Sequence, residues 1–332
     1  MPAKKKGSAV KEPQPLREIT HDEYLAFIKK SKFVTIEDAE IEIGKKHEIE
    51  SFQPSNFQLE TGSVWSFPQR GDWATHKGDY RGNWPPPLVR NLVLRYSKPG
   101  ELVLDQMCGG GTTLVECKLL NRNSIGVDIN LDSIMLSHDR LNFSYKTLDE
   151  GYIAPKQTLF QGDARNLESI KNDSINLIAT HPPYAGIIRY SKNHRIEGDL
   201  SSLSITNYLL SMSEIAKESF RVLKKGRFCA ILIGDTRQHR HYVPIAFRVM
   251  QSFLGEGFVL REDIIKQQWK LKKSGERWAG LVKKADENWV DKPEGKRFWT
   301  DFFLILHEHL FVFEKPRDKD DYTRLKNSSK WW

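Results

Sequence analysis

The stretch that decides the fold reads LVLDQMCGGGTTLVECKLLNRNSIGVDIN and runs from Leu102 to Asn130. A short apolar run ends in Asp105, three glycines follow, a periodic segment covers Thr112–Leu120, and a second apolar run ends in Asp128. This order of patterns predicts a strand, a tight turn, a helix and a second strand. The stretch is therefore interpreted as one βαβ unit.

The glycine turn and the second acid suit a nucleotide-like ligand. Gly109, Gly110 and Gly111 leave bare backbone at the N-terminus of the predicted helix, where unpaired N–H groups and the helix dipole point. Asp128 follows the second strand, where dinucleotide-binding units hold a ribose diol. The alternative is a glycine turn that serves only the packing of the helix on the strand.

A second motif follows another apolar run. Residues 174–180 read SINLIAT, a buried-strand pattern, and lead directly into His181, Pro182, Pro183 and Tyr184. Two successive prolines stop sheet pairing, fix the backbone and leave carbonyl groups free to accept hydrogen bonds. A planar substrate that carries an NH2 group fits such a site.

Together the motifs DQMCGGGTT and HPPY resemble those of the S-adenosylmethionine-dependent amino-methyltransferases, which modify exocyclic nitrogens of adenine or cytosine in DNA. The usual family forms are D-P-F-x-G-x-G-T-T and D/N/S-P-P-Y/F, and the resemblance covers roughly residues 61–315. Two positions depart from the family pattern. Gln106 replaces a proline, and His181 replaces Asp, Asn or Ser, which leaves the target base open between cytosine and adenine.

The resemblance implies roles for both motifs. A Pro182 carbonyl and a neutral His181 nitrogen would hold the target amino group, and Tyr184 would stack on a base flipped out of the duplex. The implied catalytic residues are His181, Pro182, Pro183 and Tyr184. The residues implied to bind S-adenosyl-L-methionine are Asp105, Met107, Cys108, Gly109, Gly111, Thr112, Thr113, Asp128, Ile129, Asp163, Ala164, Trp65 and Phe67.

Two of these assignments have structural alternatives. Trp65 and Phe67 precede the glycine strand, where the family contacts the methionine end of the cofactor, but they are equally suited to capping the sheet. Asp163 follows a strand expected at Gln157–Phe160 and would accept from the adenine amino group of the cofactor; otherwise it is a turn residue. No metal is expected to be required.

A basic, tryptophan-rich segment covers residues 266–300. Cations bind phosphates and tryptophans stack on bases, so this segment is interpreted as a target-recognition insert. A hairpin whose tryptophans cover the sheet is the alternative. The residues expected to contact nucleic acid, including two from the loop after HPPY, are Arg189, Lys192, Lys270, Lys272, Lys273, Arg277, Trp269 and Trp278.

Composition agrees with a polyanionic partner but does not identify one. The 332 residues carry a formal net charge of +8. The three cysteines lack CxxC or CxxH spacing, which indicates a reduced, cytoplasmic protein without structural zinc. No apolar stretch approaches the roughly 18 residues needed to span a bilayer, so no membrane contact is expected.

The predicted fold class is α/β, a doubly wound Rossmann-like methyltransferase sheet with a C-terminal antiparallel strand and a small basic insert. Helices are expected over Leu88–Tyr96, Ser133–Ser144, Ile205–Leu223 and Tyr242–Leu254, and further strands over Phe228–Asp235, Val259–Ile265 and Phe302–Phe313. The expected divisions are a disordered basic tail (1–18), an accessory segment with a helix within Ile19–Ile43 (19–60), the catalytic domain (61–265), the insert (266–300), the final strand (301–316) and a C-terminal tail (317–332).

The predicted function is site-specific methylation of DNA at N4 of cytosine or N6 of adenine, in a restriction-modification system or as an orphan enzyme. DNA is the expected partner, and whether a cognate restriction endonuclease exists stays open, as does the oligomeric state. The alternatives are methylation of guanine N2 in RNA and an inactive methylase-like nucleic-acid-binding subunit.

Overall fold

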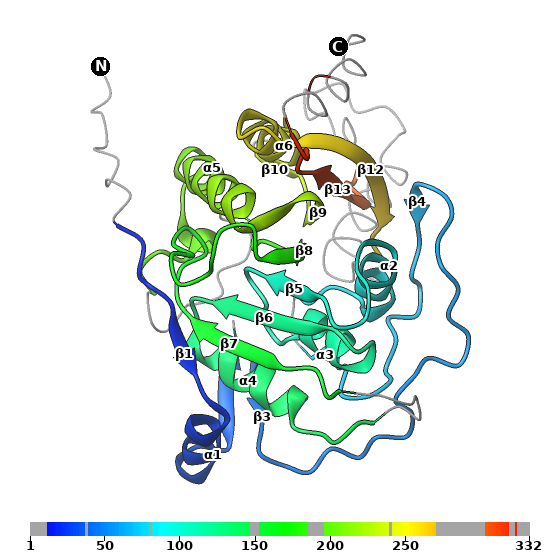
Figure 1. Cartoon of the computed structure of the whole chain (residues 1–332), viewed down its shortest axis with the longest axis vertical. Coiled ribbons are helices and arrows are strands. Elements are labelled where there is room, and N and C mark those ends of the chain that lie inside the picture. Colours follow the sequence, from blue (N-terminus) through cyan, green and yellow to red (C-terminus); the bar gives the residue numbers. More distant parts are fainter. Residues whose placement is uncertain are drawn as a thin grey trace, which may run out of the picture.

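The computed structural model describes residues 12–36, 39–79, 82–146, 153–184, 196–238, 241–269, 303–318 and 323. Within these ranges a nine-stranded sheet has the order β1-β7-β6-β5-β8-β9-β13-β12-β4 (Figure 1). Its edge strands are β1 (Arg17–Ile19) and β4 (Val64–Trp65). Its central strands are parallel: β7 (Gln157–Gln161), β6 (Asn123–Asp128), β5 (Leu102–Asp105), β8 (Ile175–Thr180) and β9 (Leu223–Ile233). β13 (His307–Glu314) and β12 (Val259–Gln267) follow as antiparallel neighbours.

Helices cover both faces of this sheet, which confirms the doubly wound α/β fold with its antiparallel C-terminal strand (Figure 1). One face carries α2 (Pro86–Tyr96), α3 (Thr112–Leu119) and α4 (Leu131–Leu141), and the other carries α5 (Ile205–Val222) and α6 (Ile245–Gly255). Apolar side chains are buried on both faces. The strand order places the carboxyl ends of β5, β6, β7 and β8 at one edge, where parallel α/β sheets bind ligands.

The expected βαβ unit is confirmed as β5, α3 and β6. The helix expected from Tyr242 begins later, at Ile245, because β11 (His241–Val243) pairs with β10 (Thr236–Gln238) and Pro244 then precedes the first helical turn. A proline at this position leaves no intrahelical hydrogen bond unmade.

The N-terminal segment differs from the expected helix within Ile19–Ile43. Its start is confirmed: Thr20 and Glu23 form a capping box at the start of α1 (His21–Lys30). The chain then forms a hairpin of β2 (Phe33–Ile36) and β3 (Ala39–Glu42). The alternating burial along β2 explains the change, because side chains of period two suit a strand rather than a helix.

Residues 17 and 18, which the sequence assigned to the N-terminal tail, belong to the sheet. They begin β1 (Arg17–Ile19), which pairs with β7 in antiparallel register. The side chain of Ile19 is buried against α1 and α4. Burying this residue stabilises an edge strand that composition alone did not predict.

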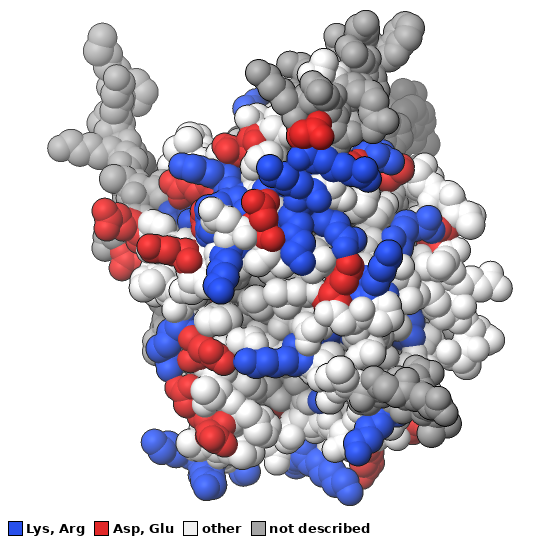
Figure 2. Space-filling model, in the orientation of Figure 1, with Lys and Arg blue, Asp and Glu red and all other residues white. Residues whose placement is uncertain are grey.

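The charged side chains are interspersed rather than segregated. Figure 2 shows lysines and arginines gathered over the region of β9 and β13, with acidic residues among them. Several basic side chains have partners, such as Arg227 with Glu101 and Arg221 with Glu218. In the described part of the chain, no helix is long and apolar enough to cross a membrane.

Candidate active site

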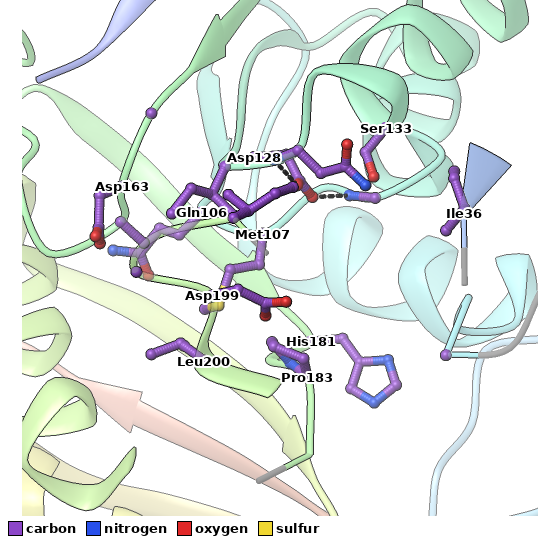
Figure 3. Close-up of a pocket in the computed structure, with 18 residues that line it drawn as sticks. Ile36, Gln106, Met107, Asp128, Ser133, Asp163, His181, Pro183, Asp199 and Leu200 are labelled. Atoms are coloured by element: carbon purple, nitrogen blue, oxygen red, sulfur yellow. Dashed lines mark hydrogen bonds between the residues drawn. The ribbon is translucent and has the colours of Figure 1, made fainter. Parts of the chain in front are cut away.

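A cavity opens at the carboxyl edge of the parallel strands (Figure 3). Both sequence motifs reach it, because the glycine loop follows β5 and the tetrapeptide follows β8. Figure 3 shows Asp128 on one side of the cavity and His181 with Pro183 on another. The lining residues are Ile36, Gly82, Gln106, Met107, Gly109, Asp128, Ile129, Asn130, Ser133, Gly162, Asp163, Ala164, His181, Pro183, Ile196, Gly198, Asp199 and Leu200.

Asp105 stabilises the glycine loop through hydrogen bonds. This carboxylate is 1% exposed, and it accepts hydrogen bonds from the Thr113 hydroxyl at 2.5 Å and from the Met107 N–H at 3.2 Å. Gly109 and Gly111 have φ of 52° and 78°, a conformation that L side chains rarely adopt. Asp105 therefore stabilises the conformation of the loop and does not line the cavity.

Asp128 connects the glycine loop to the start of α4. One carboxylate oxygen accepts from the Gly109 N–H and the other from the Asn130 N–H, both at 2.9 Å (Figure 3). Burial raises the pKa of Asp128 to about 7, although both backbone hydrogen bonds oppose the shift. Each oxygen keeps lone pairs for further donors. The group is thus a partly buried acceptor that lines the cavity.

Asp163 and Ala164 also line the cavity, but the Asp163 carboxylate already has a partner. Arg165 donates to it from its backbone N–H at 2.9 Å and from its guanidinium at 2.6 Å. The ion pair is almost completely buried. Any ligand amino group at Asp163 would therefore share a carboxylate that Arg165 already orients.

The tetrapeptide lies at the end of β8, a strand with every residue buried. His181 Nε2 lies 3.2 Å from the Tyr184 hydroxyl, and the Tyr184 ring passes so close to Gly234 that a Cβ there would lie 3.2 Å from it. Burial lowers the pKa of His181 to about 3, so its imidazole is neutral at physiological pH. Pro182 is buried, and Pro182 and Tyr184 lie beside the cavity without lining it.

The structure does not bring Trp65 and Phe67 to the cavity. Trp65 lies in β4 (Val64–Trp65) at the far edge of the sheet, where it is 2% exposed. It packs in the apolar cluster that α2, β9 and β13 share, and its ring lies 6.2 Å from that of Phe67. This placement matches the alternative in which these aromatics cover the sheet.

The remaining residues of the glycine loop lie at the start of α3 and do not line the cavity. Gly111 is the N-cap of α3, and the Thr112 hydroxyl donates to the Asn83 side chain at 2.5 Å. The residues that were expected at the cofactor and do not line the cavity are Asp105, Cys108, Gly111, Thr112, Thr113, Trp65 and Phe67.

Only one of the residues expected to contact nucleic acid lies within the described ranges. Trp269 is half-exposed, and its indole N–H donates to the Ser66 hydroxyl at 3.0 Å. The residues outside the described ranges are Arg189, Lys192, Lys270, Lys272, Lys273, Arg277 and Trp278.

Sequence reasoning missed residues that come to the cavity from distant segments. Ile36 reaches it from the β2–β3 hairpin, and Asp199 and Leu200 reach it from the segment before α5. No local pattern marks these positions. Asn130 was more accessible to prediction, because a side chain that caps a helix directly after the Asp128 strand is a recognisable signal.

The ranges that a family model matches contain both the glycine loop and the tetrapeptide. The family model described as DNA methylase matches residues 4–138 and 175–331. Type II methyltransferase M.HpaI of Haemophilus parainfluenzae is 30% identical over 134 residues, which are 39% of this chain and 40% of that protein. DNA adenine methyltransferase YhdJ of Escherichia coli is 32% identical over 90 residues, covering 27% of this chain and 31% of that protein.

One relative carries the name of an enzyme that modifies RNA. The tRNA (guanine(10)-N2)-dimethyltransferase of Methanocaldococcus jannaschii is 33% identical over 119 residues, covering 36% of this chain and 33% of that protein. The matched regions thus span less than half of the length of each of these curated relatives.

Proposed function

The chain belongs to the DNA methylase family, and from this membership we propose that it transfers a methyl group from S-adenosyl-L-methionine to an exocyclic amino nitrogen of a base in DNA. The observation that carries the proposal is the convergence of both motifs on one cavity. Gly109 and Asp128 line it from the glycine loop and β6, and His181 and Pro183 line it from the tetrapeptide.

S-adenosyl-L-methionine is the cofactor of this family, and the cavity residues fit it. The carboxylate of Asp128 has lone pairs left for ribose hydroxyls, and the bare backbone of Gly109 permits close approach. Met107, Ile129 and Leu200 add apolar surface for an adenine ring. The cofactor supplies a methyl group that its sulfonium activates for transfer.

The chain's own residues would hold the target. An exocyclic amino nitrogen shares its lone pair with the ring and is a poor nucleophile, so it needs acceptors that orient its N–H groups. A backbone carbonyl of the prolines and a nitrogen of neutral His181 are such acceptors. Tyr184 would stack on the base, which must leave the duplex to enter the site.

The similarity to type II methyltransferases supports a role in site-specific modification of DNA, within a restriction-modification system or as an orphan enzyme. We place this activity in the cytoplasm, where three buried free cysteines stay reduced. His181 does not select between N4 of cytosine and N6 of adenine, because its acceptor nitrogen suits either amino group.

Methylation of guanine N2 in RNA is the second candidate, and the similarity to the archaeal tRNA enzyme favours it. The same acceptors would hold a guanine amino group. Whether the substrate is DNA or RNA therefore has to be decided by experiment.

Mass spectrometry of nucleosides tests the proposal. The purified full chain is incubated with S-adenosyl-L-methionine and unmethylated DNA, and separately with bulk RNA. N4-methylcytosine or N6-methyladenine in DNA is the expected product and names the base. Methylguanine in RNA alone would replace the proposal by the second candidate. Cofactor binding without any methylated product would indicate an inactive nucleic-acid-binding subunit.

Cofactor affinity should depend on pH through Asp128. The pKa of Asp128 is about 7 in the folded protein, above the ordinary 3.8. The folded state therefore favours the protonated acid, and the stability that this proton contributes is lost as the pH rises from about 4 to 7. Ribose hydroxyls donate better to the ionised form, so binding has the opposite dependence. We expect affinity to fall about tenfold per pH unit below pH 7 and to level off above it.

Titration calorimetry with S-adenosyl-L-methionine between pH 5.5 and 8.5 measures this dependence. Asp128→Asn is the control, because an amide does not titrate in this range. An affinity that stays constant across the range in the wild-type protein would contradict the assigned role of Asp128.

The β2–β3 hairpin should contribute to cofactor binding through Ile36. Replacing Ile36 by alanine removes apolar surface from the cavity wall, and we expect cofactor affinity to fall about fivefold to tenfold. Ile43→Ala is the matched control, because Ile43 is equally buried in the same apolar cluster and does not line the cavity. Equal affinities of the two variants would show that the hairpin has no contact with the cofactor.

A further inference from the structure

A buried ion pair lies beside the tetrapeptide. Glu308, the second residue of β13, is 3% exposed, and its Oε2 accepts from Lys266 Nζ at 2.6 Å. Lys266 is the register partner of Glu308 on β12. Because β13 runs antiparallel to β9, its first residues lie beside the last residues of β9, at the same edge of the sheet as the cavity.

Burying such a pair has a cost that the fold does not require. Removing two charges from water is unfavourable, and apolar side chains of similar size at paired strand positions are often as stable or more stable. Glu308 nevertheless lies on the same face of β13 as the buried apolar residues Leu310 and Val312. A charged pair at this place therefore calls for a role in the site.

The neighbour of the pair is His181. Its Nε2 lies 3.8 Å from Glu308 Oε1 and 3.2 Å from the Tyr184 hydroxyl. Its Nδ1 is buried and has no hydrogen-bond partner among the residues that the structure describes. A neutral imidazole carries one N–H and one lone pair, and the group that each nitrogen faces determines which is which. An ionised carboxylate beside Nε2 favours a proton on that nitrogen.

We propose that Glu308, kept ionised by Lys266, is a positioning residue that fixes His181 as the Nε2–H tautomer and leaves Nδ1 as the acceptor for the target amino group. The inference rests on the proposed function, because that function supplies the amino group. It explains how histidine replaces the Asp, Asn or Ser of the family: the lone pair of one ring nitrogen takes the place of a side-chain oxygen.

The charges around the ring agree with this arrangement. After burial itself, the cation of Lys266 is the strongest influence that lowers the pKa of His181, and Arg70 acts in the same direction. Burial opposes both charges of the pair, because it raises the pKa of Glu308 to about 8 and lowers the pKa of Lys266 to about 8. The 2.6 Å contact between Lys266 Nζ and Glu308 Oε2 is the interaction that favours the charged form of both groups. The backbone of Gly82 also contacts the ring and favours its protonation, so a proton on Nδ1 is the competing arrangement.

Nitrogen NMR of the full chain with ¹⁵N-labelled histidine tests the tautomer directly, without any nucleic acid. Comparison with His181→Asn assigns the signals of the ring. The expected result at pH 7 is a protonated Nε2 and an unprotonated Nδ1. A proton on Nδ1 would overturn the proposal. Because no methyl transfer is measured, this outcome is independent of whether the chain methylates DNA.

Two variants then test Glu308 itself. Glu308→Gln keeps the shape and removes the charge. The double variant Glu308→Met with Lys266→Met replaces the pair by apolar side chains, so that the fold is retained even if a lone charge is not tolerated. Both should lose the tautomer preference and lower kcat at least about tenfold, with cofactor affinity within about twofold of wild type. An unchanged tautomer in both variants would show that Glu308 has no positioning role.

Lys266→Met gives a readout that a purely structural role would not move. It removes the Lys266 cation, which lowers the pKa of His181, and the pKa of His181 should therefore rise by at least about one unit. Glu308 without its partner takes up a proton, so the tautomer preference should be lost as in Glu308→Gln. The acid limb of the pH–rate profile should then move to higher pH, whereas Glu308→Gln should not move it in that direction. A rate that falls equally at every pH would assign the pair to stability alone.

Discussion

Replacing Tyr184 by alanine should lower kcat for methyl transfer by about 100-fold, with cofactor affinity within about twofold of wild type. In the proposed mechanism the ring stacks on the flipped base, and such stacking contributes about 1–3 kcal/mol per base. The substitution also removes the hydroxyl that lies 3.2 Å from His181 Nε2, so the imidazole loses a neighbour that orients it.

Cofactor binding should survive because Tyr184 does not line the cavity. Radiolabelled methyl transfer to DNA measures kcat, and calorimetry measures cofactor affinity. Tyr184→Phe is the matched variant: it keeps the stacking ring and loses only the hydroxyl, so its loss should be about tenfold or less. If Tyr184→Ala retains activity within about threefold of wild type, the stacking role is wrong.

Replacing Asp128 by alanine should weaken the binding of S-adenosyl-L-methionine by about 100-fold or more. The carboxylate accepts from the backbone N–H groups of Gly109 and Asn130, which belong to two different walls of the cavity. Without it, both backbone donors lose their acceptor, at a cost of about 1–3 kcal/mol each, and the ribose hydroxyls lose theirs. The glycine loop and the start of α4 then lose their common support.

Calorimetry gives the affinity, and urea unfolding separates it from a loss of folded protein. Asp173→Asn is the control, since Asp173 precedes β8 at the opposite edge of the sheet and asparagine tolerates its positive φ of 48°. We expect this variant to bind the cofactor normally. Normal binding by Asp128→Ala would mean that the cofactor does not lie against the end of β6.

The parts of the site that the sequence predicted are local in the chain. The glycine turn, the acid of Asp128 and the tetrapeptide each lie directly after a strand, and both motifs were expected to serve one site. A parallel sheet with short connections brings such strand ends to one edge, so their convergence follows from the pattern of apolar runs. The helices and strands of the catalytic region were found at nearly the expected places for the same reason.

The parts that the sequence missed depend on which distant segments pack together. Ile36 lines the cavity because the β2–β3 hairpin packs on α4, where Asp132 accepts from the Thr35 N–H at 2.9 Å. Trp65 lies near the glycine strand in sequence but packs at the far edge of the sheet beside β12. Proximity along the chain does not determine these contacts, because the apolar surface that a segment buries is chosen by the whole fold.

The sequence by itself determined the fold class, the family and the two motifs that face the cavity, because each is a pattern of neighbouring residues whose local geometry is nearly fixed. Only the tertiary structure decided which nitrogen of His181 faces a carboxylate. Glu308 and Lys266 reach the tetrapeptide through the antiparallel pairing of β13 with β9 and β12. That pairing is a long-range contact, and the protonation of a buried imidazole follows from the charges that such contacts place around it.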